Sequence, residues 1–184
     1  MDRDRTILDT AAAVFYEKGF HGVGVDELGT RAGLSGPALY RHFSGKDEIL
    51  AALFNEALDQ LLGATAAVHD DPATDLDRLI RHHVAFAVNH RHLVNVYQRE
   101  DRSLVDPWKR HFDRRRRHYI AQWEAIVSRR FPHATDAEIA AGTQACLSVI
   151  FSIAYWPAKL AQTPGLADLI AGFAVDGLCT LHRD

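Results

Sequence analysis

The sequence predicts an all-α protein of about nine helices. Apolar residues recur at three- and four-residue spacing along most of its 184 residues, which is the period of a helix with one buried face. No long segment alternates apolar and polar residues as a half-buried strand would. Glycine and proline, which commonly end or begin helices, stand between the periodic segments. Apolar residues make up 47% of the chain, which is enough to bury a sizeable core.

The first two expected helices are each closed by a glycine. The apolar stripe of the first consists of Ile7, Leu8, Ala11, Ala12, Val14 and Phe15. Gly19 follows this stripe and closes the helix. Val25, Leu28 and Ala32 line one face of the second helix, and Gly33 stands where a helix usually ends in the left-handed conformation.

A third helix begins directly after that turn. Ser35 is placed as its N-cap, able to accept from the next backbone N–H groups, and Pro37 lies in its first turn. Leu39 and Phe43 point back toward the second helix. The side chains expected to face outward are Ala38, Tyr40, Arg41 and His42. This arrangement is a helix-turn-helix whose second helix would enter the major groove of DNA.

Six more helices are expected after Ser44. The first of them carries Asp47 and Glu48 in its first turn, where carboxylates suit the positive end of the helix dipole. The pattern is broken by Asp70, Asp71 and Pro72. The expected spans are about 47–68, 75–89, 92–99, 107–131, 136–157 and 164–181.

Residues 6–53 resemble the TetR family of one-component transcriptional regulators. The shared pattern is a first helix ending in Gly19–Phe20, the helix-turn-helix, the run of residues 39–43 (Leu-Tyr-Arg-His-Phe), and Lys46 at the start of the fourth helix. The resemblance implies a helix-turn-helix DNA-binding domain over residues 1–46 and a helical ligand-binding and dimerisation domain over residues 47–184.

The resemblance also implies a function. It indicates a homodimeric repressor that binds a palindromic operator in double-stranded DNA and is released by a small-molecule effector. The last two helices of each subunit would pack as an intermolecular four-helix bundle. A transcriptional activator of the same fold and a helical protein-interaction module remain alternatives.

Several residues are candidates for contact with DNA. Tyr40, His42 and Lys46 resemble family positions that touch phosphate oxygens, and Arg41 could take guanine or phosphate. Gly24 departs from the family, where a serine or threonine commonly caps the second helix and reaches a phosphate. The full set of candidates is Ser35, Gly36, Pro37, Ala38, Tyr40, Arg41, His42 and Lys46. The alternative for His42 is a solvated surface histidine.

The charge of this chain excludes a protein that binds DNA through a broad positive surface potential. The net charge is -3, and residues 1–46 hold six Lys and Arg against six Asp and Glu, which leaves that segment neutral. DNA binding would therefore rest on a few placed contacts. The start of the chain lacks a secretory pattern, and no apolar run approaches the roughly 20 residues of a membrane span, so we expect a cytoplasmic protein.

The two C-terminal helices predict a dimer interface because small residues are interleaved with large apolar ones around much of their circumference. The candidate interface residues are Leu147, Ile150, Ala154, Ile170, Phe173, Ala174, Gly177 and Leu178. The alternative is two ordinary core helices of a monomer. Cys146 and Cys179 are expected to be free thiols, with a regulatory disulfide as the alternative.

Aromatic residues predict a ligand pocket in the second domain. The candidates are Phe86, Tyr97, Trp108, Phe112, Arg116, Tyr119, Trp123, Phe151 and Tyr155. Arg115 and Arg116 lie on or beside the aromatic face, where a guanidinium would suit a carboxylate or the phosphates of an acyl thioester. The alternatives are that residues 114–117 form a solvated face, with one arginine paired to a nearby carboxylate, and that the aromatic stripe is core.

Enzymatic and metal-binding functions find little support in the sequence. There is no glycine-rich phosphate loop, no nucleophile elbow, and no paired carboxylates at a pocket-facing spacing. The histidine pairs His83/His90 and His111/His118 are seven residues apart, whereas metal sites prefer closer pairs with a carboxylate or thiolate partner. We therefore expect no enzyme, no metal and no cofactor.

Overall fold

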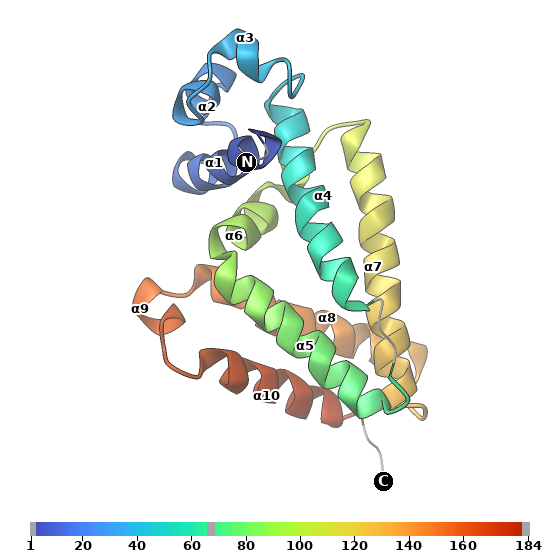
Figure 1. Cartoon of the computed structure of the whole chain (residues 1–184). Helices are drawn as coiled ribbons and strands as arrows, with labels where there is room; N and C mark the ends of the chain where they lie inside the picture. The colour runs from blue at the N-terminus through green and yellow to red at the C-terminus, as the bar shows by residue number, and fades with distance from the viewer. Residues whose placement is uncertain (1–2, 66–68, 182–184) are drawn as a thin grey trace. The chain divides into compact units, whose positions relative to one another are not determined.

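The computed structural model describes residues 3–65 and 69–181. These residues form ten α-helices and two short 3₁₀ helices, and they include no β-strand (Figure 1). The all-α prediction is therefore confirmed. The chain divides into two compact units, the first of residues 1–58 and 92–115 and the second of residues 59–91 and 116–184. Helices α4 and α7 contribute residues to both units.

The first unit begins with three helices, α1 (Arg3–Lys18), α2 (Val25–Arg31) and α3 (Gly36–Leu39), coloured blue in Figure 1. It also contains the first part of α4 (Lys46–Thr65), nearly all of α6 (Arg91–Glu100), the 3₁₀ helix η1 (Asp101–Ser103), and the start of α7 (Trp108–Arg130). Side chains from these helices form the core of the unit; those almost fully buried include Ile7, Phe15, Leu28, Leu39, Leu50 and Phe54.

The α1–α2 loop, residues 19–24, is held by the carboxylate of Glu100 at the end of α6. Glu100 Oε1 accepts a hydrogen bond from the Phe20 backbone N–H at 3.2 Å, and the Ser103 hydroxyl donates to Glu100 Oε2 at 3.0 Å. Gly19 has φ +74, and an added Cβ would lie 3.3 Å from the Arg99 guanidinium. Because a buried carboxylate needs such donors, this contact fixes the loop against α6.

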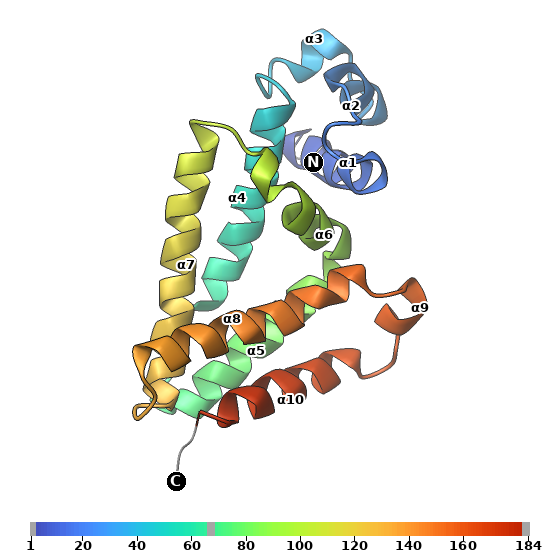
Figure 2. The ribbon, with the colours of Figure 1, turned by 180° about the vertical axis from the view of Figure 1, so that it is seen from behind.

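The second unit is built around three helices that lie side by side in both views, α5 (Pro72–Asn89), α8 (Asp136–Ser152) and α10 (Leu166–Cys179) (Figures 1 and 2). The 3₁₀ helix η2 (Ile153–Tyr155) and the short α9 (Ala158–Ala161) connect α8 to α10. Thr135 and Glu138 form a capping box at the start of α8. Such a box satisfies two backbone N–H groups that the first turn would leave unpaired.

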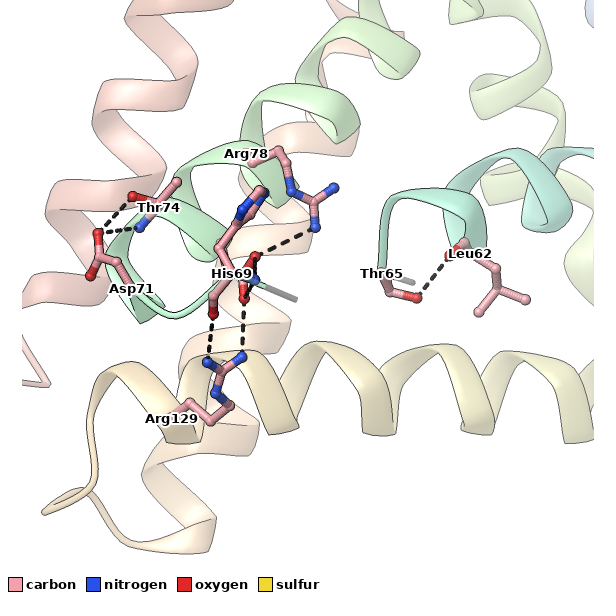
Figure 3. A network of polar contacts seen from close by, with 8 residues as sticks. Leu62, Thr65, His69, Asp71, Thr74, Arg78 and Arg129 are labelled. Atoms are coloured by element: carbon pink, nitrogen blue, oxygen red, sulfur yellow. Dashed lines mark hydrogen bonds and ion pairs between the residues drawn. The ribbon is translucent and has the colours of Figure 1, made fainter. Parts of the chain in front are cut away.

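A buried carboxylate anchors the start of α5 to α7, and two of its partners, His69 and Arg129, are labelled in Figure 3. Asp75 is fully buried, and both of its oxygens accept from the His69 backbone N–H at 2.9 Å. Arg129 donates to Asp75 Oδ2 and to the His69 carbonyl, each at 3.0 Å. Although burial opposes ionisation, these hydrogen bonds from His69 and Arg129 leave the pKa of Asp75 below its usual value.

His83 is a second buried polar group of this unit, and it is neutral. Its Nδ1 lies 2.7 Å from the Leu79 carbonyl, so Nδ1 carries the hydrogen, while Nε2 accepts from Trp123 Nε1 at 3.2 Å. Tyr119 stacks on the imidazole at 5.7 Å between ring centroids. Burial lowers the pKa of His83 to about 3, because a charged imidazolium would lose its hydration there.

The helix boundaries differ from the expected ones in several places. Helix α5 starts at Pro72 instead of near residue 75, because the Asp71 side chain caps it by accepting from the N–H groups of Ala73 and Thr74. The short α9 was not expected. The predicted end of the fourth helix falls on residues 66–68, outside the described residues.

One segment of the described chain, Asp136–Tyr155, has the length and composition of a membrane span. The expectation that no apolar segment reaches this length is therefore wrong. Its side chains Ile139, Thr143 and Ile150 are buried where α8 packs on α5 and α10, as in a core helix. Only 39% of the span is buried within the subunit, so much of its apolar outer surface is uncovered.

Candidate nucleic-acid interface

The turn between α2 and α3 is a Schellman motif. The N–H of Gly33 bonds to the carbonyl of Thr30 at 3.1 Å, and the N–H of Leu34 bonds to the carbonyl of Gly29 at 2.8 Å. Gly33 has φ +69, the left-handed conformation that the sequence predicts for it. The helix-turn-helix is thus confirmed, and its two helices are joined by a fixed connection.

The second helix of this motif is short, and the chain continues in a hydrogen-bonded turn. Helix α3 ends at Leu39, after which Phe43 N–H bonds to the Leu39 carbonyl at 3.1 Å. Leu39 and Phe43 are buried, as predicted. The exposed residues are Ser35, Pro37, Tyr40, Arg41 and His42, with Tyr40 exposed to 54%. These side chains form the surface that is available to a duplex.

Ala38 does not belong to that surface. The prediction that it faces outward is wrong, since only 8% of it is exposed. With Ala38 turned inward beside Leu39, a helix of only four residues presents fewer side chains than the sequence pattern suggested.

Both helix starts lack a side-chain cap. Gly24, at φ -95 and ψ 159, is the N-cap of α2, and Ser35 is the N-cap of α3, but neither makes a side-chain cap hydrogen bond. The cap position of Ser35 is therefore as predicted, whereas the predicted bond is absent. A Cβ at Gly36 would come within 2.8 Å of Asp26 Oδ1, so a larger residue there would require the Asp26 carboxylate to shift.

Lys46 supports the motif from the start of α4. Its ammonium donates to the carbonyls of Phe20 and Val23, both at 3.1 Å, and lies 4.5 Å from the centroid of the Phe20 ring. These bonds occupy two of the three N–H donors of the ammonium. Lys46 is thus a structural contact of the α1–α2 loop, and its predicted contact with phosphate stays a prediction.

His42 is also bonded within the protein. Its Nδ1 lies 2.6 Å from Asp4 Oδ1 of α1. The side chains of His42 and Asp4 are 29% and 55% exposed, so the pair is open to solvent. The sequence reasoning did not identify Asp4 as part of this surface, because nothing in the local pattern links residues 38 positions apart.

Several cations of the neutral N-terminal segment are paired with carboxylates. Arg31 pairs with Glu17 at 2.8 Å, and other pairs join Lys18 to Glu27 and Arg5 to Glu56. All of these pairs are at least partly exposed. Arg41 is exposed, and among the described residues no ion pair involves it. Arg41 is therefore the cation best placed for a new contact.

The candidate pocket residues fall into separate aromatic groups. In the first unit Phe54, Tyr97 and Phe112 pack together, with centroids 5.3 to 5.9 Å apart. In the second unit Tyr119 and Trp123 surround His83.

The other candidates differ in exposure. Phe86 is buried, Trp108, Arg116 and Phe151 are half-buried, and Tyr155 is 55% exposed. Arg115 donates to Asn55 Oδ1 at 2.7 Å. The pocket stays a prediction.

The candidate interface residues are mostly core residues of the second unit. Those with 4% exposure or less are Leu147, Ile150, Ala154, Ile170, Ala174 and Leu178, so their side chains pack within the subunit and are not presented to a second copy. Phe173 is 64% exposed, and Gly177 is exposed. Phe173 and Gly177 are therefore the candidates left on the surface, and their part in a dimer interface stays a prediction.

The histidines and cysteines form no metal cluster in the part of the chain that the structure describes. Within residues 3–65 and 69–181, no group of three or more His, Cys, Asp or Glu side chains could hold a metal ion. Cys146 and Cys179 are free thiols, as expected, and burial raises the pKa of Cys146 to about 12. Cys146 is thus protonated and unreactive at neutral pH.

The fold and this surface place the N-terminal segment among the helix-turn-helix structures. Residues 7–53 match the family described as bacterial regulatory proteins, tetR family. Residues 7–53 are thus similar to the DNA-binding segment of this family.

Two relatives illustrate the similarity in sequence. The transcriptional activator FasR of Mycolicibacterium smegmatis is 41% identical over 61 residues, which are 33% of this chain and 28% of that protein. The transcriptional repressor KstR2 of Mycobacterium tuberculosis is 33% identical over 102 residues, which are 54% of this chain and 51% of that protein. The chain therefore matches about half, or less, of the length of these relatives.

Solved structures extend the similarity in fold to almost the whole chain. The regulator PfmR from Thermus thermophilus superposes with a TM-score of 0.80 at 25% identity, covering 96% of this chain and 99% of that one. AibR in complex with isovaleryl coenzyme A and operator DNA gives 0.79 at 22% identity, covering 95% and 96%. These similarities agree with the all-helical fold.

Proposed function

We propose that this protein is a ligand-responsive transcriptional regulator that binds a palindromic operator as a homodimer in the cytoplasm. The observation that carries the proposal is the Schellman-joined helix pair, which leaves Tyr40, Arg41 and His42 exposed side by side. One such unit can contact only a few base pairs, so a two-fold pair of units on two half-sites is the economical way to recognise an operator. In this reading, residues 1–46 bind DNA, and residues 47–184 bind ligand and dimerise.

A repressor is the favoured form of this regulator. KstR2 is named a repressor and its match covers 54% of this chain, whereas the match to the activator FasR covers 33%. A repressor occupies its operator without ligand and releases it when an effector binds preferentially to another conformation. Tenfold induction requires at least about 1.4 kcal/mol of coupling between the two sites. An activator is the second candidate, supported by the higher identity to FasR.

The effector class is an acyl thioester of coenzyme A. AibR was solved with isovaleryl coenzyme A, and a fatty acid metabolism regulator protein of Bacillus subtilis is 29% identical over 100 residues. The aromatic residues of the second domain would accept an acyl chain, and Arg116 is one candidate partner for the phosphates.

The test is a binding experiment on DNA from upstream of the gene that encodes the protein. Specific retardation of this DNA, relieved by isovaleryl coenzyme A but not by coenzyme A alone, supports the proposal. Binding without sequence preference would favour a protein-interaction module. Specific binding that no acyl thioester relieves would overturn the effector class and leave the regulator in place.

A further inference from the structure

The contact between Asp4 and His42 assigns the tautomer of an imidazole on the proposed DNA-binding surface. An ionised carboxylate only accepts hydrogen bonds, so the hydrogen between Asp4 Oδ1 and His42 Nδ1, 2.6 Å apart, must be on the nitrogen. A neutral imidazole carries one N–H. Neutral His42 therefore has an unprotonated Nε2, which is an acceptor.

A phosphate oxygen is an acceptor as well, and two acceptors facing each other repel. Only the imidazolium, with an N–H on both nitrogens, can donate to Asp4 and to a phosphate at the same time. We infer that operator binding takes up a proton at His42 in each subunit, and that Asp4 is the positioning residue that imposes this requirement. The inference rests on the proposed function and adds a pH response to it.

Other charged groups lie on the elements that flank His42. They include Arg3, Arg5 and Asp9 on α1, Arg41 in the same turn, and Lys46, Asp47, Glu48 and Glu56 on α4. Arg5 pairs with Asp9 at 3.4 Å and also with Glu56. Glu48 Oε2 accepts from the Ser44 backbone N–H at 2.6 Å and from its hydroxyl at 2.7 Å. Asp4 is the carboxylate in hydrogen-bond contact with the imidazole.

The approach of DNA changes the balance at this pair. A phosphate beside Nε2 adds a negative charge that favours the imidazolium, in addition to the charge of Asp4. The bound form therefore holds more protons than the free form, and affinity must fall as pH rises. Each subunit contributes at most one proton, which corresponds to a tenfold change in the binding constant per pH unit.

The experiment compares four proteins on one duplex, selected from a random library by the wild-type protein. Affinity is measured by fluorescence anisotropy from about pH 5.5 to 8 at constant ionic strength, because phosphate contacts depend on salt. The variants are His42→Gln, which keeps a neutral donor, Asp4→Asn, and the control Asp9→Asn, which removes another exposed carboxylate of α1.

The expected result is a steep fall in affinity with pH for the wild type and for Asp9→Asn, and a shallower fall for His42→Gln. In Asp4→Asn the amide can donate to Nδ1, so neutral His42 can carry its hydrogen on Nε2. This variant should lose the steep pH dependence and, at the alkaline end, bind at least as tightly as the wild type. Circular-dichroism melts should show that all four proteins are folded, since the exchanged groups are exposed.

Two results would overturn the inference while the proposed function stands. One is specific binding with equal pH slopes in the wild type and His42→Gln; the other is a steep slope that Asp4→Asn retains in full. If the wild-type protein selects no sequence over nonspecific DNA at any pH, the proposed function itself fails, and the inference fails with it.

Discussion

The carboxylate of Glu100 accepts a hydrogen bond from the backbone N–H of Phe20, 80 positions earlier in the chain, at 3.2 Å. Both residues are buried, with 7% and 2% of their surface exposed. This bond ties the loop that precedes the helix-turn-helix to the end of α6, so the candidate DNA-binding motif depends on a residue outside the matched segment.

Replacing Glu100 by Ala should lower the free energy of unfolding by about 2 kcal/mol, because the buried Phe20 N–H loses its acceptor. Urea unfolding measures the change. The control is Glu17→Ala, which breaks the exposed ion pair with Arg31 and should cost less than about 1 kcal/mol. Equal effects in the two variants would contradict the role assigned to Glu100.

Tyr40 and Lys46 should separate DNA binding from stability. Tyr40→Phe removes an exposed phenolic donor, so it should weaken operator binding about fivefold with no measurable change in unfolding. Lys46→Met removes the ammonium that donates to the carbonyls of Phe20 and Val23. It should therefore weaken operator binding and, unlike Tyr40→Phe, also lower the free energy of unfolding by about 1 kcal/mol. Anisotropy and thermal melts report the two quantities. A Lys46→Met protein of unchanged stability would speak against the structural contact.

His83 should make stability depend on pH. Its folded-state pKa is about 3, below the ordinary 6.5, so the unfolded chain binds a proton that the folded protein excludes. The stabilisation is complete above about pH 6.5 and is lost as pH falls toward about 3. Between about pH 6.5 and 5 the loss should be about 2 kcal/mol, at 1.4 kcal/mol per unit.

The variant His83→Gln isolates this contribution, because its amide does not titrate. The difference in unfolding free energy between the wild type and the variant should shrink as pH falls over that interval. A difference that stays constant would show that His83 is protonated equally in the two states.

The carboxylate of Asp75 should be one of the costliest groups to remove. Asp75→Ala leaves the His69 N–H and Arg129, which is 38% exposed, without their acceptor, and the loss of such an acceptor costs about 1 to 3 kcal/mol. The control Asp77→Ala breaks the exposed pair with Arg81 and should cost less than about 1 kcal/mol. Chemical unfolding measures both changes. A larger loss of unfolding free energy in Asp77→Ala than in Asp75→Ala would contradict this prediction.

Phe173 should control assembly. It is 64% exposed on α10, so Phe173→Glu places a charge on the proposed interface without entering the core. We expect sedimentation to show a shift from dimer to monomer, with the helical signal unchanged. Val105→Glu, at a 47% exposed apolar residue of the first unit, is the control and should leave the dimer intact. A wild-type protein that sediments as a monomer would contradict the proposed assembly.

Local signals made the N-terminal motif predictable. Gly33 could be placed in the left-handed conformation, and Leu39 and Phe43 in the core, because each depends on near neighbours in the chain. Ala38 was misplaced because a small apolar residue suits either side of a helix. The bonds from Glu100 to Phe20 and from His42 to Asp4 join distant positions, so no periodicity reports them.

The candidate interface residues could not be separated from core residues by sequence alone, for a different reason. Helices α8 and α10 are apolar on more than one face, so composition indicates that two surfaces are covered but does not say which residue belongs to which. The packing of α8 and α10 on α5 settles this for Ile150 and Ile170, which are core residues, and for Phe173, which is not.

The short length of α3, four residues, affects how the protein would distinguish an operator from other DNA. Gly36 and Pro37 offer no side-chain donor, and Ala38 is turned inward, so few groups are left to read base edges directly. An operator could then be recognised partly through the duplex itself, by groove width, stiff A-tracts and the steps that kink easily. Base pairs that no side chain touches would in that case contribute to the choice of operator.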